Sequence, residues 1–203
     1  MRQTTHVTSD ASQNPGFRVL VVCTGNICRS PAGERLLRHR LPLGSGIEVA
    51  SAGTHGVVGH PVEPTMARLL VEDGVDAEHF AARRLSAALV AEADLVLGME
   101  TEHRSAAVTA YPRALTRTFT LREFAHLVEV GRLGERTARL SADPAARLRE
   151  IAALAAELRI ARSVPVCAEP DIADPYGQGE AAYRVAYAAI TQSAEILSLA
   201  AFT

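Results

Sequence analysis

A continuous apolar run near the start of the chain is the first pattern that predicts structure. Residues 17–22, FRVLVV, are rich in β-branched side chains and do not alternate with polar ones, which is typical of a strand buried on both faces of a parallel sheet. A glycine-containing turn follows. Ser30 and Pro31 are then suited to cap and open a helix that runs through His39 and ends before Pro42.

The same alternation repeats along the next eighty residues or so. It predicts three more strands and two more helices, in chain order over residues 46–51 (strand), 64–73 (helix), 94–99 (strand), 101–110 (helix) and 115–119 (strand). Alternating segments of this kind predict an α/β fold with a mostly parallel sheet.

Two further apolar stripes at helical spacing lie in the last third of the chain. One predicts a buried helix that packs on the sheet, and its members are Tyr183, Tyr187, Ile190, Ala194 and Leu197. The other lies within residues 123–166, a segment rich in Ala, Arg, Leu and Glu. There Asp143 is suited to cap, and Pro144 to open, an amphipathic helix of about five turns.

Length and composition indicate one domain. The chain has 203 residues, of which 48% are hydrophobic, enough to bury one core but few for two. We expect residues 1–16, which are mostly polar, to be a disordered tail, and residues 17–203 to form a single domain with a helical insertion at about 123–166.

The charge pattern argues against several function classes. All 21 basic residues are arginine, scattered among 23 acidic residues, so we expect no nucleic-acid partner. No apolar run is expected to reach the length of a membrane span, and the N-terminus lacks a signal-peptide pattern, so we expect no membrane association. Three cysteines, an odd number, favour a reducing, cytoplasmic setting over a disulfide framework.

The turn after the first strand carries the strongest chemical signal. Cys23 stands at the carboxyl end of a predicted parallel strand, where ligands of such sheets bind. The N–H groups of residues 24–30 and the dipole of the following helix favour a bound anion, phosphate above all, and the thiolate form of Cys23. Arg29 has the planar fork that holds two oxygens of an oxyanion, and Ser30 is suited to donate a hydrogen bond to the thiolate.

Simpler explanations of this turn are weaker. Small core cysteines beside a surface arginine would explain Cys28 alone, but not the whole string of Cys, five residues, Arg and Ser between a strand and a helix. A zinc site is disfavoured because no nearby pair of Cys or His completes four ligands.

The motif from Cys23 to Pro31 has the form C-x-G-N-x-C-R-S-P, which resembles the signature of the low-molecular-weight protein tyrosine phosphatases. Residues 51–54 (SAGT), 93–100 (ADLVLGME) and 174–177 (DPYG) resemble further landmarks of that family in the same order. The resemblance implies a four-stranded parallel sheet flanked by helices, a Rossmann-like fold of the phosphotyrosine protein phosphatase I type. It also implies a phosphomonoesterase that needs no metal or other cofactor.

The resemblance and the chemistry of the turn assign the same catalytic residues. Cys23 attacks phosphorus to form a phosphocysteine, Arg29 stabilises charge on the equatorial oxygens, and Asp174 acts as general acid and then as base. The loop expected to hold the phosphate consists of Thr24, Gly25, Asn26, Ile27, Cys28 and Ser30.

The choice of acid has competing interpretations. Asp143-Pro144 and Asp174-Pro175 are both candidates, and both are also explicable as turn starters. Asp143 fits a helix cap, whereas Asp174 lies in the stretch that resembles the acid loop of the family. We expect Asp171 to be a loop or capping residue.

Family analogy also assigns supporting residues. Hydrogen bonds that brace the loop are expected from Asn26, Ser51 and His79. A plain surface histidine is the alternative for His79, because the residues after it fit the family pattern poorly. The resemblance further implies that Cys28 protects Cys23 by capturing its sulfenic acid as a disulfide. Cys167 has no expected role.

The predicted substrate pocket differs from that of many relatives. Aliphatic residues, Val57 among them, follow residue 54 where many relatives place an aromatic wall. Tyr176 is the candidate for contact with the substrate ring, with ordinary packing as its alternative. This pattern resembles the bacterial branch that dephosphorylates tyrosine kinases of capsule and exopolysaccharide export. The expected partner is therefore a phosphotyrosine protein, such as an autophosphorylating kinase, and the expected state is a monomer.

The helix of the predicted insertion has three interpretations. A helix that simply packs on the body is favoured over a partner-binding helix. Because residues 123–166 lead into the expected acid loop, a helix that borders the mouth of the active site is the third interpretation.

Three other functions stay open. An arsenate reductase on the same scaffold would need further thiols, for which Cys28 and Cys167 are available, but the Asp174-Pro175 pair argues against it. A phosphoarginine phosphatase typically has threonine at the position of Ile27. A phosphate-binding protein without catalysis is disfavoured because all the expected catalytic residues are present.

Overall fold

The computed structural model describes residues 16–41, 44–138 and 141–202. The predicted disordered tail, residues 1–16, lies outside the described residues apart from Gly16, so that prediction stays untested.

Four parallel strands form one sheet, as predicted. They are β1 (Phe17–Cys23), β2 (Ile47–Gly53), β3 (Leu95–Gly98) and β4 (Thr118–Thr120), in the spatial order β2-β1-β3-β4. β1 therefore lies inside the sheet, paired on both sides. Cys23 is opposite Gly53 in the register, so β1 and β2 end together at one edge.

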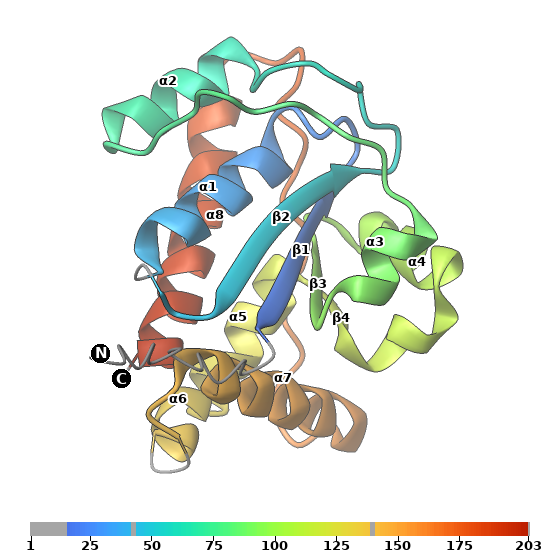
Figure 1. Cartoon of the computed structure of the whole chain (residues 1–203), viewed down its shortest axis with the longest axis vertical. Helices are drawn as coiled ribbons and strands as arrows, with labels where there is room; N and C mark the ends of the chain where they lie inside the picture. Colours follow the sequence, from blue (N-terminus) through green and yellow to red (C-terminus); the bar gives the residue numbers. More distant parts are fainter. Residues whose placement is uncertain (1–15, 42–43, 139–140, 203) are drawn as a thin grey trace, which may run out of the picture.

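Helices cover both faces of this sheet (Figure 1). One face is covered by α1 (Arg29–Arg40), α2 (Pro64–Glu72), α5 (Leu121–Val130) and α8 (Glu180–Phe202), and the other by α3 (Ala87–Glu92), α4 (Thr101–Ala110) and the 3-10 helix η1 (Pro112–Arg117). The side chains of β1 alternate between two cores: Val19 and Val21 enter the first, and Leu20 and Val22 the second. Burial on both faces explains why the sequence of β1 does not alternate.

Four elements differ from the prediction: β4, α3, α5 and α6 (Leu133–Thr137), the last two being helices that no expected element covers. The strand expected over residues 115–119 is wrong in its first three positions, because Pro112 opens η1 and Thr118 Oγ1 donates to the carbonyl of Ala114 at 2.7 Å. α3 is absent from the prediction. Its six residues are too short to show a helical period, although Ser86 caps it by accepting from the N–H of Leu89 at 3.3 Å.

The amphipathic helix predicted after Asp143 is confirmed as α7 (Pro144–Ala161), preceded by α6 (Leu133–Thr137). Asp143 Oδ2 accepts from the N–H of Ala146 at 3.2 Å, which makes it the N-cap. The buried side of α7 joins the first core through Leu148, Ile151 and Ala155.

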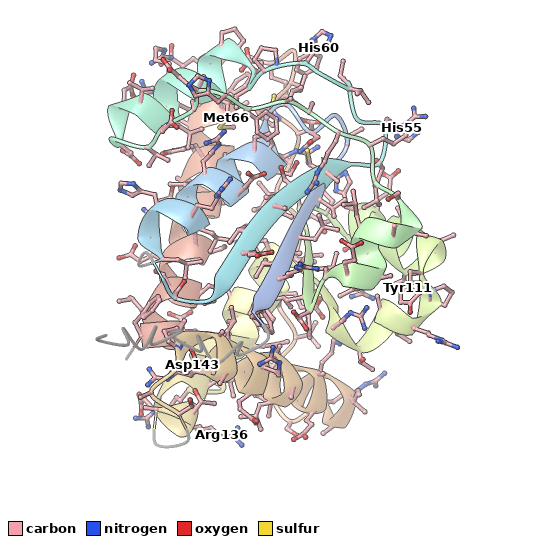
Figure 2. The ribbon with its side chains drawn as sticks, in the orientation of Figure 1. His55, His60, Met66, Tyr111, Arg136 and Asp143 are labelled. Atoms are coloured by element: carbon pink, nitrogen blue, oxygen red, sulfur yellow. The ribbon has the colours of Figure 1, made fainter. Side chains whose placement is uncertain are left out.

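α7 lies across the amino ends of the strands. The guanidinium of Arg149 is 5.6 Å from the ring centre of Phe17, the first residue of β1, and Arg159 Nη1 donates to the carbonyl of Thr118, the first residue of β4, at 2.8 Å. Cys23 ends β1 at the opposite edge, and Figure 2 shows Asp143 far from His55, which follows the carboxyl end of β2. The alternative that this helix borders the active-site mouth is therefore wrong. The helix packs on the body, as the favoured interpretation expects, and the partner-binding alternative stays untested.

α8 corrects another expectation. An 18-residue window of it has a mean hydropathy of 1.3, so the helix is long and apolar enough to span a membrane by length and composition alone, contrary to the sequence-based expectation. Half of that window is buried within the protein. The predicted stripe is buried in the first core, as expected, and its members are Tyr183, Tyr187, Ile190, Ala194 and Leu197. These contacts are those of a core helix.

Candidate active site

A loop between β1 and α1 forms a cradle of N–H groups. Its carbonyls turn outward: those of Cys23, Thr24, Gly25 and Ile27 accept from backbone N–H groups within residues 54–63 at 2.8 to 3.0 Å. Because a trans peptide points its N–H opposite to its C=O, the N–H groups that follow these carbonyls face the inside of the loop. The loop is thus arranged to bind an anion, as the sequence predicts.

The thiol of Cys23 lies at the centre of this cradle. Its Sγ is 2.9 Å from Ser30 Oγ and accepts from the N–H of Asn26 at 3.3 Å. α1 begins at Arg29 with Cys28 as N-cap and without a capping side chain. The prediction that Ser30 caps this helix is therefore wrong, and its hydroxyl lies beside the thiol instead.

A network of buried polar side chains braces the loop. Asn26 has φ of 55°, and its Nδ2 donates to Ser30 Oγ at 2.9 Å and to Ser51 Oγ at 2.8 Å. Ser51 Oγ in turn donates to Glu34 Oε2 at 2.7 Å. The expected contacts of Asn26 and Ser51 are confirmed, and Glu34 is a member that the sequence analysis does not identify.

The loop also rests closely on β2. A Cβ added to Gly53 would lie 2.5 Å from the carbonyl oxygen of Thr24 and 2.8 Å from the amide nitrogen of Asn26. Only glycine leaves room for the loop to approach the strand here.

His79 does not take part in this network. Its side chain is 91% exposed, and its nearest charged partner is Glu78 at 4.0 Å. The bracing role inferred for His79 is therefore wrong, and the surface-histidine alternative is correct. Arg83 supplies the contact instead, because its N–H donates to Asn26 Oδ1 at 2.8 Å and its Nε to the carbonyl of Ser51 at 2.7 Å.

Arg29 is the most deeply buried charge of the site, with its side chain only 1% exposed. Its Nη1 donates to Glu100 Oε2 at 2.7 Å and to the carbonyl of Ile172 at 2.8 Å, and its Nη2 lies 2.6 Å from Asp174 Oδ2. Within the described part of the chain, its Nε has no hydrogen-bond partner. A buried guanidinium with an unused donor is well suited to receive an oxyanion.

The three aspartates considered for the acid lie in different surroundings. Asp174 contacts Arg29 and is 42% exposed, so it is open to a substrate. Asp171 Oδ1 accepts from the N–H and the hydroxyl of Thr101, at 2.7 and 2.8 Å, and so caps the start of α4, as expected. Asp143 lies at the other edge of the sheet, where it caps α7.

Cys23, Arg29 and Asp174 open into one cleft of about 240 Å³. Val57, 38% exposed, and Tyr176, 63% exposed, stand on its walls, where the sequence predicts them. Ile27 and Val57 flank the same point, because a Cβ on Gly25 would lie 3.3 and 3.8 Å from them. The cleft therefore has aliphatic side chains beside a single exposed tyrosine.

All three cysteines are free thiols. Burial, with smaller contributions from Glu63 and other negative groups, raises the pKa of Cys28 to about 12. Cys167 is half-buried and lies outside the cleft. Among the residues that the structure describes, no group of three His, Cys, Asp or Glu is placed to hold a metal ion.

Comparison with known proteins agrees with this geometry. The sequence profile of the family described as low molecular weight phosphotyrosine protein phosphatase matches residues 18–133. The chain belongs to this family. Its match reaches into the segment predicted as an insertion, so α5 lies within the residues that match the family and α7 outside them.

Relatives within the family support a bacterial tyrosine phosphatase. The low molecular weight protein-tyrosine-phosphatase Etp of Escherichia coli K12 is 45% identical over 112 residues, which cover 55% of this chain and 74% of Etp. The protein-arginine-phosphatase of Geobacillus stearothermophilus is 38% identical over 109 residues, covering 53% and 71%. The crystal structure of the tyrosine phosphatase AmsI from Erwinia amylovora superposes with a TM-score of 0.63 at 27% identity, covering 90% of this chain and 91% of AmsI.

Proposed function

We propose that this family member hydrolyses phosphotyrosine and other aryl phosphate monoesters through a phosphocysteine intermediate. One observation carries the proposal: the Cys23 thiol lies in a cradle of N–H groups, and a buried arginine with an unused Nε and an open carboxylate stand at the same cleft.

In the first proposed step, Cys23 Sγ attacks phosphorus and the bond to the aryl oxygen breaks. The inward N–H groups and Arg29 stabilise the charge on the three equatorial oxygens, and a protonated Asp174 gives its proton to the departing phenolate. In the second step, Asp174 takes a proton from water, the water oxygen bonds to phosphorus, and the S–P bond breaks. Ser30 Oγ, 2.9 Å from Sγ, stabilises the thiolate that leaves.

The substrate that we propose is a phosphotyrosine protein, because the family acts on phosphoproteins. We narrow this to an autophosphorylating tyrosine kinase, on the basis of the resemblance to the bacterial branch. The aliphatic wall gives less stacking on the phenyl ring than an aromatic wall would, so most of the recognition falls on the phosphate and on Tyr176.

We further propose a cytoplasmic monomer in which residues 17–203 work as one domain. The three free thiols support a reducing compartment. The core that α7 shares with β1, α5 and α8 supports one domain.

Two rival reactions are less favoured. Ile27 stands at the cleft where, by family resemblance, phosphoarginine phosphatases typically have threonine. An arsenate reductase would need its thiols to be accessible in turn, whereas Cys28 is buried and Cys167 lies outside the cleft.

The deciding experiment is hydrolysis of p-nitrophenyl phosphate in the presence of a metal chelator. We expect turnover by the native protein and by the control variant Cys167→Ser, and none by Cys23→Ser. Rapid quenching should trap a phosphorylated protein that carries phosphorus on Cys23. Turnover that survives in Cys23→Ser would contradict the proposal.

Parallel assays with different substrates distinguish the tyrosine phosphatase from the two rival reactions. A phosphotyrosine peptide should be cleaved faster than a phosphoarginine peptide, and a thiol-coupled assay should show no arsenate reduction. The reverse preference, or arsenate reduction without phosphatase turnover, would replace the proposed function with the corresponding rival.

A further inference from the structure

A histidine beside the phosphate loop has no role in the mechanism above. His103 lies in the first turn of α4 and is only 2% exposed. Its Nε2 is 2.9 Å from Thr24 Oγ1, and its Nδ1 is 3.1 Å from the backbone nitrogen of Glu100. The start of α4 therefore makes two contacts with the site. His103 contacts the loop, and the carboxylate of Glu100 contacts Arg29.

The hydrogen bonds determine where the proton of this ring lies. The backbone N–H of Glu100 can only donate, so Nδ1 of His103 must accept and carries no hydrogen. In the neutral ring the single N–H is then on Nε2, and it donates to Thr24 Oγ1.

The surroundings keep the ring neutral near pH 7. Burial lowers the pKa of His103 below its usual 6.5, and the positive charge of Arg29 lowers it further. Glu100, Glu102 and Asp174 act in the opposite direction with smaller effect. Protonation would place a second N–H on Nδ1, facing the N–H of Glu100, and would break that contact.

The hydroxyl of Thr24 can still donate one hydrogen bond. Its oxygen accepts from Nε2 of His103 and, at 3.4 Å, from Nη2 of Arg29, and neither group can accept in return. The hydroxyl hydrogen must therefore point toward a third partner. Thr24 lines the cleft together with Cys23, where the proposed substrate places its phosphate oxygens.

We propose that His103 is a positioning residue of the phosphate site, and that it fixes the Thr24 hydroxyl as a hydrogen-bond donor to a phosphate oxygen of the substrate. This inference rests on the proposed function. It adds a side-chain donor to the N–H groups of the loop, and it makes the start of α4 a second support of the site.

Two substitutions of His103 separate its two hydrogen bonds. Asn can place its Oδ1 near Nδ1 and keep the acceptor for Glu100, but it does not reach Thr24. Gln can place its amide nitrogen near Nε2 and restore the donor. We expect His103→Asn to lower kcat/KM for p-nitrophenyl phosphate about tenfold, as the loss of one hydrogen bond to a charged group would, and His103→Gln to recover most of it.

A double-mutant cycle tests whether the effect passes through Thr24. We expect Thr24→Val to lose about tenfold as well, and the pair His103→Asn/Thr24→Val to lose no more than either variant alone. Thr109→Ala, an exposed change at the far end of α4, is the control for the helix and should change nothing. Additive losses, an unaffected Thr24→Val, or a Gln variant as poor as Asn would overturn the proposal.

Two further measurements, a pH profile and phosphate binding, distinguish a positioning role of His103 from a purely structural one. The native protein should lose kcat/KM through an additional ionisation below pH 6.5 that is absent in His103→Gln, because glutamine does not titrate. Calorimetric titration with inorganic phosphate should show the same tenfold weakening in His103→Asn and Thr24→Val without any turnover. If the native protein binds phosphate but hydrolyses no aryl ester, the proposed function fails, while the binding data still decide the role of His103.

Discussion

Two arginines at opposite edges of the sheet, the buried Arg29 and the half-buried Arg159, make a direct comparison. At the carboxyl edge, Arg29 contacts two carboxylates and leaves its Nε unused. At the amino edge, Arg159 of α7 donates to the carbonyls of residues 115, 116 and 118 at 3.0, 3.4 and 2.8 Å, and its guanidinium stacks 4.0 Å from the ring centre of Phe119. Burial lowers the pKa of Arg159, and Glu123 at 3.8 Å offsets part of that effect.

The difference shows which of the two charges is available for chemistry. The hydrogen-bond acceptors of Arg159 are backbone carbonyls of η1 and β4, which are part of the fold itself. The partners of Arg29 include the half-exposed carboxylate of Asp174, which a phosphate dianion can replace. Many hydrogen bonds to a guanidinium therefore do not mark a functional arginine, whereas exchangeable partners and an unused donor do.

The largest expected contrast comes from the same change at both positions. Arg29→Lys removes the planar fork and should lower kcat/KM for p-nitrophenyl phosphate by about 10³-fold or more. Arg159→Lys should leave kcat/KM within a few-fold but lower the free energy of unfolding by about 1–3 kcal/mol, because carbonyls lose their donors. Steady-state kinetics and urea unfolding measure the two effects, and similar kinetic losses in both variants would remove the distinction.

The two Asp-Pro pairs give the next contrast. Asp174→Ala should lower kcat by about 10²-fold or more and should remove the leaving-group proton transfer. Asp143→Ala should keep kcat and lower the free energy of unfolding by about 1 kcal/mol, the usual cost of a lost N-cap. Since an activated ester needs less help from an acid, the loss in Asp174→Ala should grow from p-nitrophenyl phosphate to phenyl phosphate. An equal loss with both esters would argue that Asp174 acts otherwise.

A substitution in the buried side of α7 tests whether the amino edge affects stability without affecting catalysis. Ile151 is fully buried, so Ile151→Ala should lower the free energy of unfolding by about 2–5 kcal/mol while KM and kcat of the remaining folded protein stay unchanged. Ile151→Val is the matched control and should lose about 1 kcal/mol. A selective change in KM for a phosphoprotein would show that α7 contributes to substrate binding after all.

The last prediction concerns oxidation of the cysteines at the carboxyl edge, where no residue is replaced. Dilute peroxide should produce a Cys23-Cys28 disulfide, with activity recovered by added thiol. Because the pKa of Cys28 is raised to about 12, its thiolate fraction, and hence the rate of ring closure, should rise about tenfold per pH unit between pH 7 and 9. Peptide mapping of Cys167→Ser identifies the crosslink. Permanent inactivation without it would contradict the protective role.

Periodicity predicts the long and buried elements well. β1 and α8 have the residues that the apolar pattern assigns to them, because burial on two faces or on one stripe dominates their composition. α5 is an exception, since it buries one side yet is not predicted, whereas α4 is predicted although it buries only His103 and Ala107. α3 and β4 are predicted poorly, since six and three residues are too few for a period and η1 is decided by local turn chemistry. The placement of α7 at the amino edge depends on tertiary packing that the order of elements does not reveal.

The centre of the site is predictable, but its supports are not. Cys23, Arg29 and Asp174 belong to short motifs and meet at one cleft, as expected. Glu100 and His103 carry a signal that was available, because polar residues directly after a parallel strand lie at the ligand edge. Arg83 braces the loop partly through its backbone N–H, for which no residue type is diagnostic.

The partners of Arg29 lie far apart in the sequence, so the ribosome synthesises them at different times. Among these residues Cys23 and Arg29 are synthesised first. Glu100 follows some 70 residues after Arg29, and Ile172 and Asp174 a further 70 residues or so later. At about 5–20 residues per second, the nascent chain carries its nucleophile for roughly 8–30 s before its acid exists. Until Asp174 has been synthesised, the cysteine is therefore an ordinary thiol on an incomplete domain whose site still lacks its acid.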